Sequence, residues 1–292
     1  MQVVLEGLYM IKKCSVVAAD IDGTLALKGE NPLPKTTAAI IRLHNEGVLF
    51  GVASGRPLDH RVLDYAKKWN LGFDFDFAIG VNGGELYTLE TGKVEKFYPL
   101  KKETIRDILS FLIPLDVNAI VYSDGYNRIY ALKNDAFMED SRQRNHSVVE
   151  IGGIDLLSSE ETGKIEVHAT KDKEAEILRL LKGHAGNEWI CIKTFELYDH
   201  VTYEFLDPRV NKGLALQEYS KFKQIPLEEF MAFGDMENDI GLLREAGWGV
   251  CLINGSDATK AVAQAITEYS VEEDGVGKYL EMHWFNREEK DE

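Results

Sequence analysis

Short apolar runs alternate along this chain with longer amphipathic segments, and the alternation predicts its secondary structure. In the first part of the chain, apolar runs at 16–21, 49–53 and 77–81 are typical of buried strands, and residues 36–46 show helical periodicity up to Gly47. Strands that alternate with helices favour a parallel sheet with right-handed crossovers. The same rhythm returns later, and the helices and strands expected there cover residues 212–222, 230–233, 242–246 and 249–253.

Between these two regions the pattern changes to hairpins with isolated helices. Residues 86–88 and 94–98 are expected to pair around one turn, and residues 119–122 and 128–131 around a second turn. Further helices are expected at 104–112 and 173–181, and further strands at 164–169, 189–192 and 201–205. This mixture is typical of an α+β module that has been inserted into the first domain.

The insertion indicates two domains, which also suits a chain of 292 residues. We predict an α/β fold in which a Rossmann-like parallel-sheet core, residues 1–85 and 207–292, carries an inserted α+β cap domain, residues 86–206. A module on two chain crossings can hinge over a crevice of the core and exclude water from it. A passive insertion is the alternative.

Two carboxylates stand where the first predicted strand ends. Asp20 and Asp22 follow directly on the apolar run, and the carboxyl ends of strands in an open parallel sheet form the ligand crevice. Gly23 allows a sharp turn there, and the hydroxyl of Thr24 is expected to hydrogen-bond back and hold it. Asp-Gly is also ordinary turn chemistry, so this pair alone leaves a plain polar turn open.

Three more polar clusters follow in order: Ser54-Gly55-Arg56 after the second strand, Asn211-Lys212-Gly213 at a helix start, and residues 234–239 after a later strand. Four clusters in this order resemble the haloacid dehalogenase-like phosphohydrolases, specifically their Cof-type subfamily. The likeness covers nearly the whole chain, including Val81-Asn82-Gly83-Gly84 before the family's cap and a tail from 246–250 through Asn254 to 273–276. It implies a core with an inserted α+β cap.

The charge balance limits the partners and points to a cation. The chain has 49 acidic and 33 basic residues, a formal net charge of −16, so we expect neither nucleic acid nor anionic membranes as partners. Clustered carboxylates would also repel a small phosphate ester unless a cation lay among them. Mg²⁺ prefers oxygen ligands and touches substrate phosphates, so it is the expected cofactor. The proposed ligands are Asp20, Asp22, Asp235 and Asp239.

The resemblance implies a role for each acid. Asp20 corresponds to the nucleophile that forms an aspartyl-phosphate. Asp22 corresponds to the general acid and base, and in the family its backbone carbonyl also contacts the metal. Asp235 would bind the metal, and Asp239 would orient the lysine or a metal-bound water, although an acid at a helix start is also a common cap.

Other residues supply hydrogen-bond donors for a phosphoryl group. Ser54 and Lys212 carry donors suited to its equatorial oxygens, and Gly55 lets the backbone come close. Asn238 is the remaining expected substrate contact. Outside such a pattern, a serine after a strand is often a helix cap and a lysine is usually solvated.

We therefore expect a Mg²⁺-dependent phosphomonoesterase that acts on a small phosphorylated metabolite, such as a sugar phosphate or a phosphorylated cofactor. A phosphosugar mutase with the same phospho-aspartate is the alternative, and a catalytically silent regulator is a third reading. Cap residues that could read the substrate are Tyr122, Asp124, Arg128, Arg142, Arg144 and His146. The three cysteines are far apart and odd in number, which favours a reducing cytoplasm.

Two segments depart from the resembled pattern. The loop near the fifth strand has Leu-Ile-Asn-Gly-Ser at 252–256 where relatives commonly have Met-Gly-Asn-Ala, which puts a substrate contact from Asn254 in doubt. The lysine motif follows Asp-Pro-Arg-Val at 207–210 instead of a glycine-rich approach. Neither change alters the expected chemical groups.

Overall fold

The computed structural model describes residues 12–183, 188–197 and 199–286. They form two compact units: a core unit, up to Glu95 and from Asn211 onward, and a cap unit, Lys96–Val210. The expected boundaries lay ten residues earlier at the first crossing and four earlier at the second. The first difference arises because the hairpin expected in the cap, β4 (Glu85–Thr88) and β5 (Lys93–Lys96), extends the core sheet instead.

The core unit is built on one eight-stranded sheet with the order β14-β13-β12-β1-β2-β3-β4-β5. Strand β1 (Val16–Asp20) lies in the middle, between β2 (Leu49–Ala53) and β12 (Phe230–Gly234), and pairs parallel with both. The outer parallel strands are β3 (Phe77–Gly80), β13 (Trp248–Cys251) and β14 (Ala265–Ile266). The chain leaves β1 toward β2 and later returns on the other side at β12, so the carboxyl ends of β1 and β12 flank a topological switch point.

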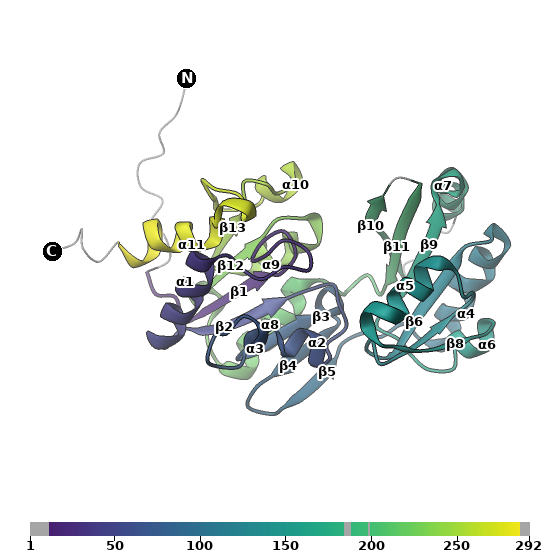
Figure 1. Ribbon diagram of the computed structural model, residues 1–292, viewed down its shortest axis with the longest axis horizontal. Helices are drawn as coiled ribbons and strands as arrows, with labels where there is room; N and C mark the ends of the chain where they lie inside the picture. The colour runs from purple at the N-terminus through teal and green to yellow at the C-terminus, as the bar shows by residue number, and fades with distance from the viewer. Residues whose placement is uncertain (1–11, 184–187, 198, 287–292) are drawn as a thin grey trace, which may run out of the picture. The chain divides into compact units, whose positions relative to one another are not determined.

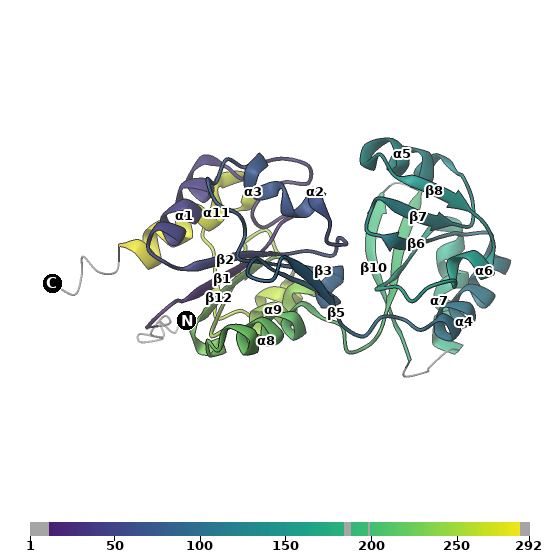
Figure 2. The same ribbon diagram turned by 90° about the horizontal axis from the view of Figure 1, so that it is seen from below.

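Helices cover both faces of this sheet (Figure 2). On one face lie α1 (Pro34–Asn45), α2 (His60–Leu63), α3 (Tyr65–Lys68) and α11 (Gly275–Tyr279), and on the other lie α8 (Lys212–Lys223) and α9 (Ile240–Glu245). Short helix α10 (Asp257–Lys260) follows β13. Because both faces are covered, the central strands are apolar except for Asp20 at the end of β1, and all five residues of β1 are buried.

The cap unit contains a six-stranded sheet with the order β10-β11-β9-β6-β7-β8 (Figure 1). Its strands are β6 (Asn118–Asp124), β7 (Arg128–Ala131), β8 (Val148–Ile151), β9 (Ile165–Thr170), β10 (Ile190–Leu197) and β11 (His200–Leu206). Buried side chains of α4 (Lys102–Leu112) and α7 (Glu174–Gly183) pack on one face, beside short helix α6 (Ile154–Leu157). The other face packs against Met138 of α5 (Ala136–Asn145).

The expected α/β fold with an inserted α+β module is confirmed, and the hairpin β6–β7 forms as predicted. The pattern gave no sign of α5 or β8. Helix α5 has no continuous apolar stripe, and its N-cap is Asp135, whose carboxylate accepts from the N–H of Met138 at 2.8 Å. Among the described residues, no helix combines the length and apolar character that crossing a membrane requires.

Candidate active site

Three buried carboxylates meet at the switch point of the core sheet. Asp20 is the last residue of β1, and Asp235 follows the last residue of β12. The two strands are parallel neighbours, with Ala19 opposite Phe233, so their carboxyl ends lie at the same edge of the sheet. Asp239 comes from the 3₁₀ turn Glu237–Asp239 that precedes α9. One carboxylate oxygen from each of the three acids lies within 4.8 Å of the corresponding oxygens of the other two.

A fully buried lysine joins two of these acids. Lys212 opens α8, and Asn211 caps the helix by accepting the N–H of Leu214 at 3.0 Å. The Lys212 Nζ donates to Asp20 Oδ1 and to Asp239 Oδ1, each at 2.5 Å, and its side chain is 0% exposed. The sequence pattern predicts that this lysine contacts the phosphoryl group, and in the structure it directly contacts Asp20.

Backbone close to the site leaves room only for glycine at two positions. Gly83 has a φ of +105°, and a Cβ there would lie 1.9 Å from the carbonyl oxygen of Asn211. Gly23 has a φ of +96°, and a Cβ there would lie 2.4 Å from Asp235 Oδ2. The segment after β3 therefore fixes the start of α8, and the loop after β1 presses on Asp235.

The charges of the cluster do not balance. Burial raises the pKa of Asp20 well above its ordinary value, against the effect of Lys212 and with that of the other two acids. Burial and Asp239 also raise the pKa of Asp235, to about 6. Burial alone would lower the pKa of Lys212, but Asp20 and Asp239 hold it above its ordinary value. One ammonium thus faces three carboxylates, and a bound cation would relieve the excess negative charge.

Asp239 has both oxygens engaged within the protein. Its Oδ1 accepts from Lys212, and its Oδ2 accepts from the backbone N–H groups of Asp235 at 3.0 Å and Met236 at 3.1 Å. Asp239 therefore positions the lysine and the turn after β12. Thr24 differs from expectation, because its hydroxyl donates to Asp235 Oδ1 at 2.8 Å and so joins the two strand ends.

Asp22 lies beside the carboxylate group but is held by a different cation. Its side chain is 31% exposed, compared with 10% for Asp20. Arg56 Nη2 donates to both of its oxygens, at 2.8 Å and 2.7 Å. The sequence pattern contained Arg56 within Ser54-Gly55-Arg56 but gave it no role, because a loop arginine has no preferred partner in sequence.

The remaining residues expected to contact the phosphoryl group, Ser54, Gly55 and Asn238, all lie next to Asn82. Asn238 Nδ2 donates to Asn82 Oδ1 at 3.1 Å, and a Cβ on Gly55 would lie 3.0 Å from the same oxygen. Asn82 has a φ of +53°, and its N–H donates to the carbonyl of Ser54 at 3.1 Å. Sequence reasoning missed this asparagine, although an Asn-Gly-Gly segment directly after a strand is a signal for left-handed backbone.

Both polar groups of the Asn254 side chain are hydrogen-bonded within the core unit. Its Nδ2 donates to the carbonyl of Gly23 at 2.9 Å, and its Oδ1 accepts the N–H of Val271 at 2.9 Å. Asn254 therefore ties the loop after β1 to the C-terminal tail, even though its neighbours differ from the resembled pattern.

The cap unit holds a separate polar cluster on β9 and β11. Lys164 contacts Glu204, and Glu166 accepts from Tyr122 at 2.9 Å and bonds to His168 at 2.8 Å. The alternation of Lys164, Glu166 and His168 with apolar residues could have revealed this polar face. Of the other cap residues singled out from the sequence, Arg142 pairs with Glu139 on α5, His146 ends that helix, and Asp124 and Arg128 lie around the β6–β7 turn.

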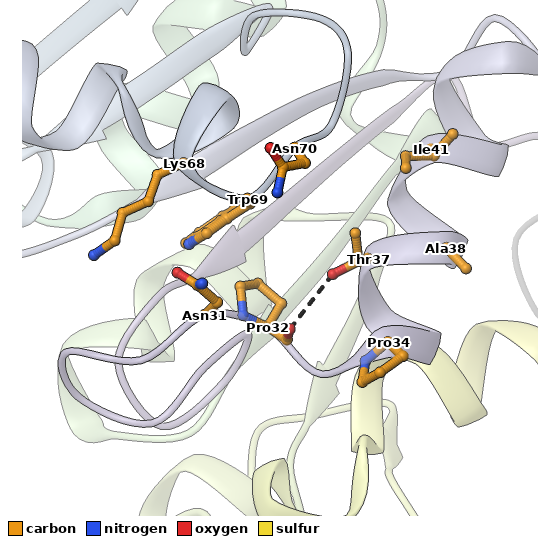
Figure 3. A pocket seen from close by; sticks show the side chains of 9 residues that line it. All are labelled: Asn31, Pro32, Pro34, Thr37, Ala38, Ile41, Lys68, Trp69 and Asn70. Atoms are coloured by element: carbon orange, nitrogen blue, oxygen red, sulfur yellow. Dashed lines mark hydrogen bonds between the residues drawn. The ribbon is translucent and has the colours of Figure 1, made fainter.

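A hollow of about 430 Å³ lies elsewhere on the core unit (Figure 3). It is lined by Asn31, Pro32, Pro34, Thr37, Ala38, Ile41, Lys68, Trp69 and Asn70. None of the carboxylates lines it, and its single ionisable residue, Lys68, is exposed. This hollow therefore lacks the groups that phosphoryl chemistry needs.

Comparisons with known proteins identify the family of this chain. The family profile of haloacid dehalogenase-like hydrolases matches residues 17–280. The 5-amino-6-(5-phospho-D-ribitylamino)uracil phosphatase YitU of Bacillus subtilis is 25% identical over 94% of this chain and 99% of its own length. The HMP-PP phosphatase of Yersinia enterocolitica is 25% identical over 93% of this chain and 95% of its own length.

A solved structure has the same fold over nearly the same extent. The crystal structure of TM0651 from Thermotoga maritima superposes with a TM-score of 0.78 and 26% identity, covering 92% of this chain and 97% of that one. Because the family profile spans most of the chain, the chain belongs to the haloacid dehalogenase-like hydrolase family and is an enzyme.

Proposed function

We propose that this hydrolase is a Mg²⁺-dependent phosphatase that cleaves small phosphate monoesters through an aspartyl-phosphate. The observation that carries the proposal is the buried Lys212, held at 2.5 Å from both Asp20 and Asp239 beside the carboxylate of Asp235. This arrangement pairs a nucleophilic acid with a fixed cation, as phosphoryl transfer requires.

Asp20 and Asp22 perform the bond changes. A carboxylate oxygen of Asp20 attacks phosphorus, the bond from phosphorus to the leaving oxygen breaks, and that oxygen takes a proton from Asp22. Water then attacks phosphorus and gives a proton to Asp22, the bond to Asp20 breaks, and inorganic phosphate leaves. Each cycle therefore returns both acids to their starting state.

Lys212, Ser54, Gly55 and Asn238 hold the phosphoryl group. Lys212 stabilises the charge that spreads over the phosphoryl oxygens, and Ser54 offers a hydroxyl from the loop after β2. Gly55 leaves space for close backbone approach. Asn82, which bonds to Asn238, keeps that amide in place and is an additional positioning residue.

The residues fit a bound Mg²⁺. Three carboxylate oxygens lie within 4.8 Å of one another, and burial raises the pKa of Asp235, which marks uncompensated charge. Asp20 and Asp235 are the proposed side-chain ligands, with the backbone carbonyl of Asp22. Because both oxygens of Asp239 are engaged, we assign it to the lysine rather than to direct coordination. When bound, Mg²⁺ would neutralise charge on the transferring phosphoryl group.

The substrate is a small phosphorylated metabolite, a sugar phosphate or a phosphorylated cofactor. Support comes from the phosphatase names of the Bacillus and Yersinia relatives and from a net charge of −16, which disfavours polyanionic substrates. Among the described residues, Cys14, Cys191 and Cys251 form no disulfide, which suits a reducing cytoplasm, where such metabolites occur.

The test combines a variant with a product analysis. Asp20→Asn should abolish turnover and phosphoenzyme formation while the protein stays folded, because an amide lacks the nucleophilic charge. In the unaltered enzyme, inorganic phosphate should appear in step with substrate loss, and ¹⁸O from water should enter that phosphate. An isomeric sugar phosphate with little free phosphate would replace this proposal with a mutase, and full activity of Asp20→Asn would end it.

A further inference from the structure

Asp22 stands at the end of a chain of fixed contacts that begins on a neighbouring helix. Arg56 Nη2 donates to both carboxylate oxygens of Asp22, so the plane of that carboxylate is set by the guanidinium. A carboxylate on a loop would otherwise be free to rotate about two side-chain bonds. The position of the guanidinium therefore decides where a proton on Asp22 can be delivered.

Arg56 is anchored at both ends. Its backbone N–H donates to Ser54 Oγ at 3.2 Å, and its carbonyl accepts the N–H of Val81 at 2.9 Å. At the far end, Arg56 Nη1 donates to the hydroxyl of Tyr65 at 2.6 Å. An arginine side chain has several flexible bonds, so this last contact removes freedom that the backbone contacts leave.

Tyr65 itself is part of a rigid aromatic group. It is buried on α3, its ring lies 5.0 Å from that of Trp69 at an interplanar angle of 23°, and Trp69 in turn meets Phe75 edge-on at 5.7 Å. Its hydroxyl is therefore presented to Arg56 from a packed surface rather than from a mobile loop.

We propose that Tyr65 is a positioning residue of this enzyme, which acts through Arg56 to hold Asp22 where it protonates the leaving oxygen. This inference rests on the proposed function, because it assumes that Asp22 is the general acid and base. It adds a residue that does not touch the substrate and that the motif pattern did not include.

Leaving-group dependence separates positioning from a merely structural role. Phenyl phosphate and p-nitrophenyl phosphate have nearly the same shape, but phenolate is the stronger base and needs a proton as it leaves, whereas p-nitrophenolate does not. Loss of Asp22 alignment should therefore slow phenyl phosphate selectively. A structural defect would slow both substrates alike.

The experiment is Tyr65→Phe, which removes only the hydroxyl and keeps the ring on Trp69. We expect kcat/KM for phenyl phosphate to fall about tenfold, the order of one hydrogen bond to a charged group, and kcat/KM for p-nitrophenyl phosphate to change less than about twofold. Tyr219→Phe is the matched control, since the Tyr219 hydroxyl is buried and has no hydrogen-bond partner among the described residues. It should leave both values unchanged.

A second variant tests the route through Arg56. Arg56→Lys should show the same selectivity, and Tyr65→Phe should add nothing further in the double variant. An equal fall for both substrates, no fall, or additive effects would overturn the inference. Asp20→Asn must be inactive on both substrates for the proposed function to stand, and Asp22→Asn must show the phenyl-selective loss for its acid role to stand, so each failure is identified separately.

Discussion

The carboxylate of Asp235 is predicted to destabilise the metal-free protein. Asp235 is buried, and its pKa is raised from an ordinary value of 3.8 to about 6 by burial and by Asp239. Keeping the group ionised at pH 7 costs about 1.4 kcal/mol for each unit of that shift, or about 3 kcal/mol in all. Asp235→Asn removes the charge and retains an oxygen to accept the hydroxyl of Thr24, so it should stabilise the metal-free core unit.

Thermal unfolding in excess chelator checks this expectation. At pH 7, the transition of Asp235→Asn should lie roughly 5–10 °C above that of the unaltered protein. A carboxyl whose pKa is raised on folding gains protons in the folded state, so the unaltered protein becomes more stable as the pH falls from 6 toward 4. The difference between the two proteins should therefore shrink over that window. Added Mg²⁺ should stabilise the unaltered protein more than the variant.

Asp274→Asn provides the control for replacing any buried aspartate with asparagine. Asp274 Oδ1 accepts from the N–H and hydroxyl of Thr36, each at 2.7 Å, and Oδ2 accepts the N–H of Lys35 at 2.8 Å. The amide of the variant has one acceptor oxygen fewer than the carboxylate, so the free energy of unfolding should fall by about 1–3 kcal/mol. A metal-free Asp235→Asn protein that is no more stable than the unaltered one at pH 7, or a difference that stays the same at pH 4.5, would refute the reasoning.

Three more predictions concern the same site. At the proposed metal site, protons and Mg²⁺ would compete for Asp235, so the Mg²⁺ concentration for half-maximal activity should rise as the pH falls below about 6. Metal titrations at several pH values that give one constant would contradict this. Lys212→Met leaves Asp20 and Asp239 without their cation, so urea unfolding should show a loss of about 3–5 kcal/mol together with lost turnover. In Gly83→Ala the added Cβ would clash with the carbonyl of Asn211, so the free energy of unfolding should fall by well over ~1 kcal/mol. Gly29→Ala is the control, because Gly29 has a similar φ but nothing within 4 Å, and it should cost only ~1 kcal/mol. Equal melting temperatures of the two variants would exclude the clash.

The strand-end acids were accessible to sequence reasoning because topology alone brings them together. An apolar run that ends in Asp20 and another that is followed by Asp235 need only adjacent, parallel strands to become neighbours. Lys212 and Asp239 followed from the ordered motif pattern. The direct contacts among them depend on how α8 and the turn before α9 sit on the sheet, which the pattern does not encode.

The proposed positioning residues, Asn82 and Tyr65, were harder to predict. Asn82 depends on a left-handed backbone conformation, and Tyr65 reaches Arg56 only through the orientation of a one-turn helix. The core boundary was wrong at β4 and β5 because a hairpin signal says that two strands pair but not which sheet they join. Strand β9 of the cap was expected, and its alternating residues could have revealed a polar face, but the partners of that face lie on other strands and could not be read from the pattern.

Different cationic partners explain how two acids two positions apart in the sequence come to differ. Asp20 is bound by Lys212, the first residue of α8, which also contacts Asp239. Asp22 is bound by Arg56, which follows β2, the strand beside β1. Asp20 is buried and contacts an ammonium, whereas Asp22 is partly exposed and accepts two hydrogen bonds from a guanidinium. A single Asp-x-Asp segment at the end of a central strand can therefore supply two separately fixed acids, which are the proposed nucleophile and the proposed proton carrier.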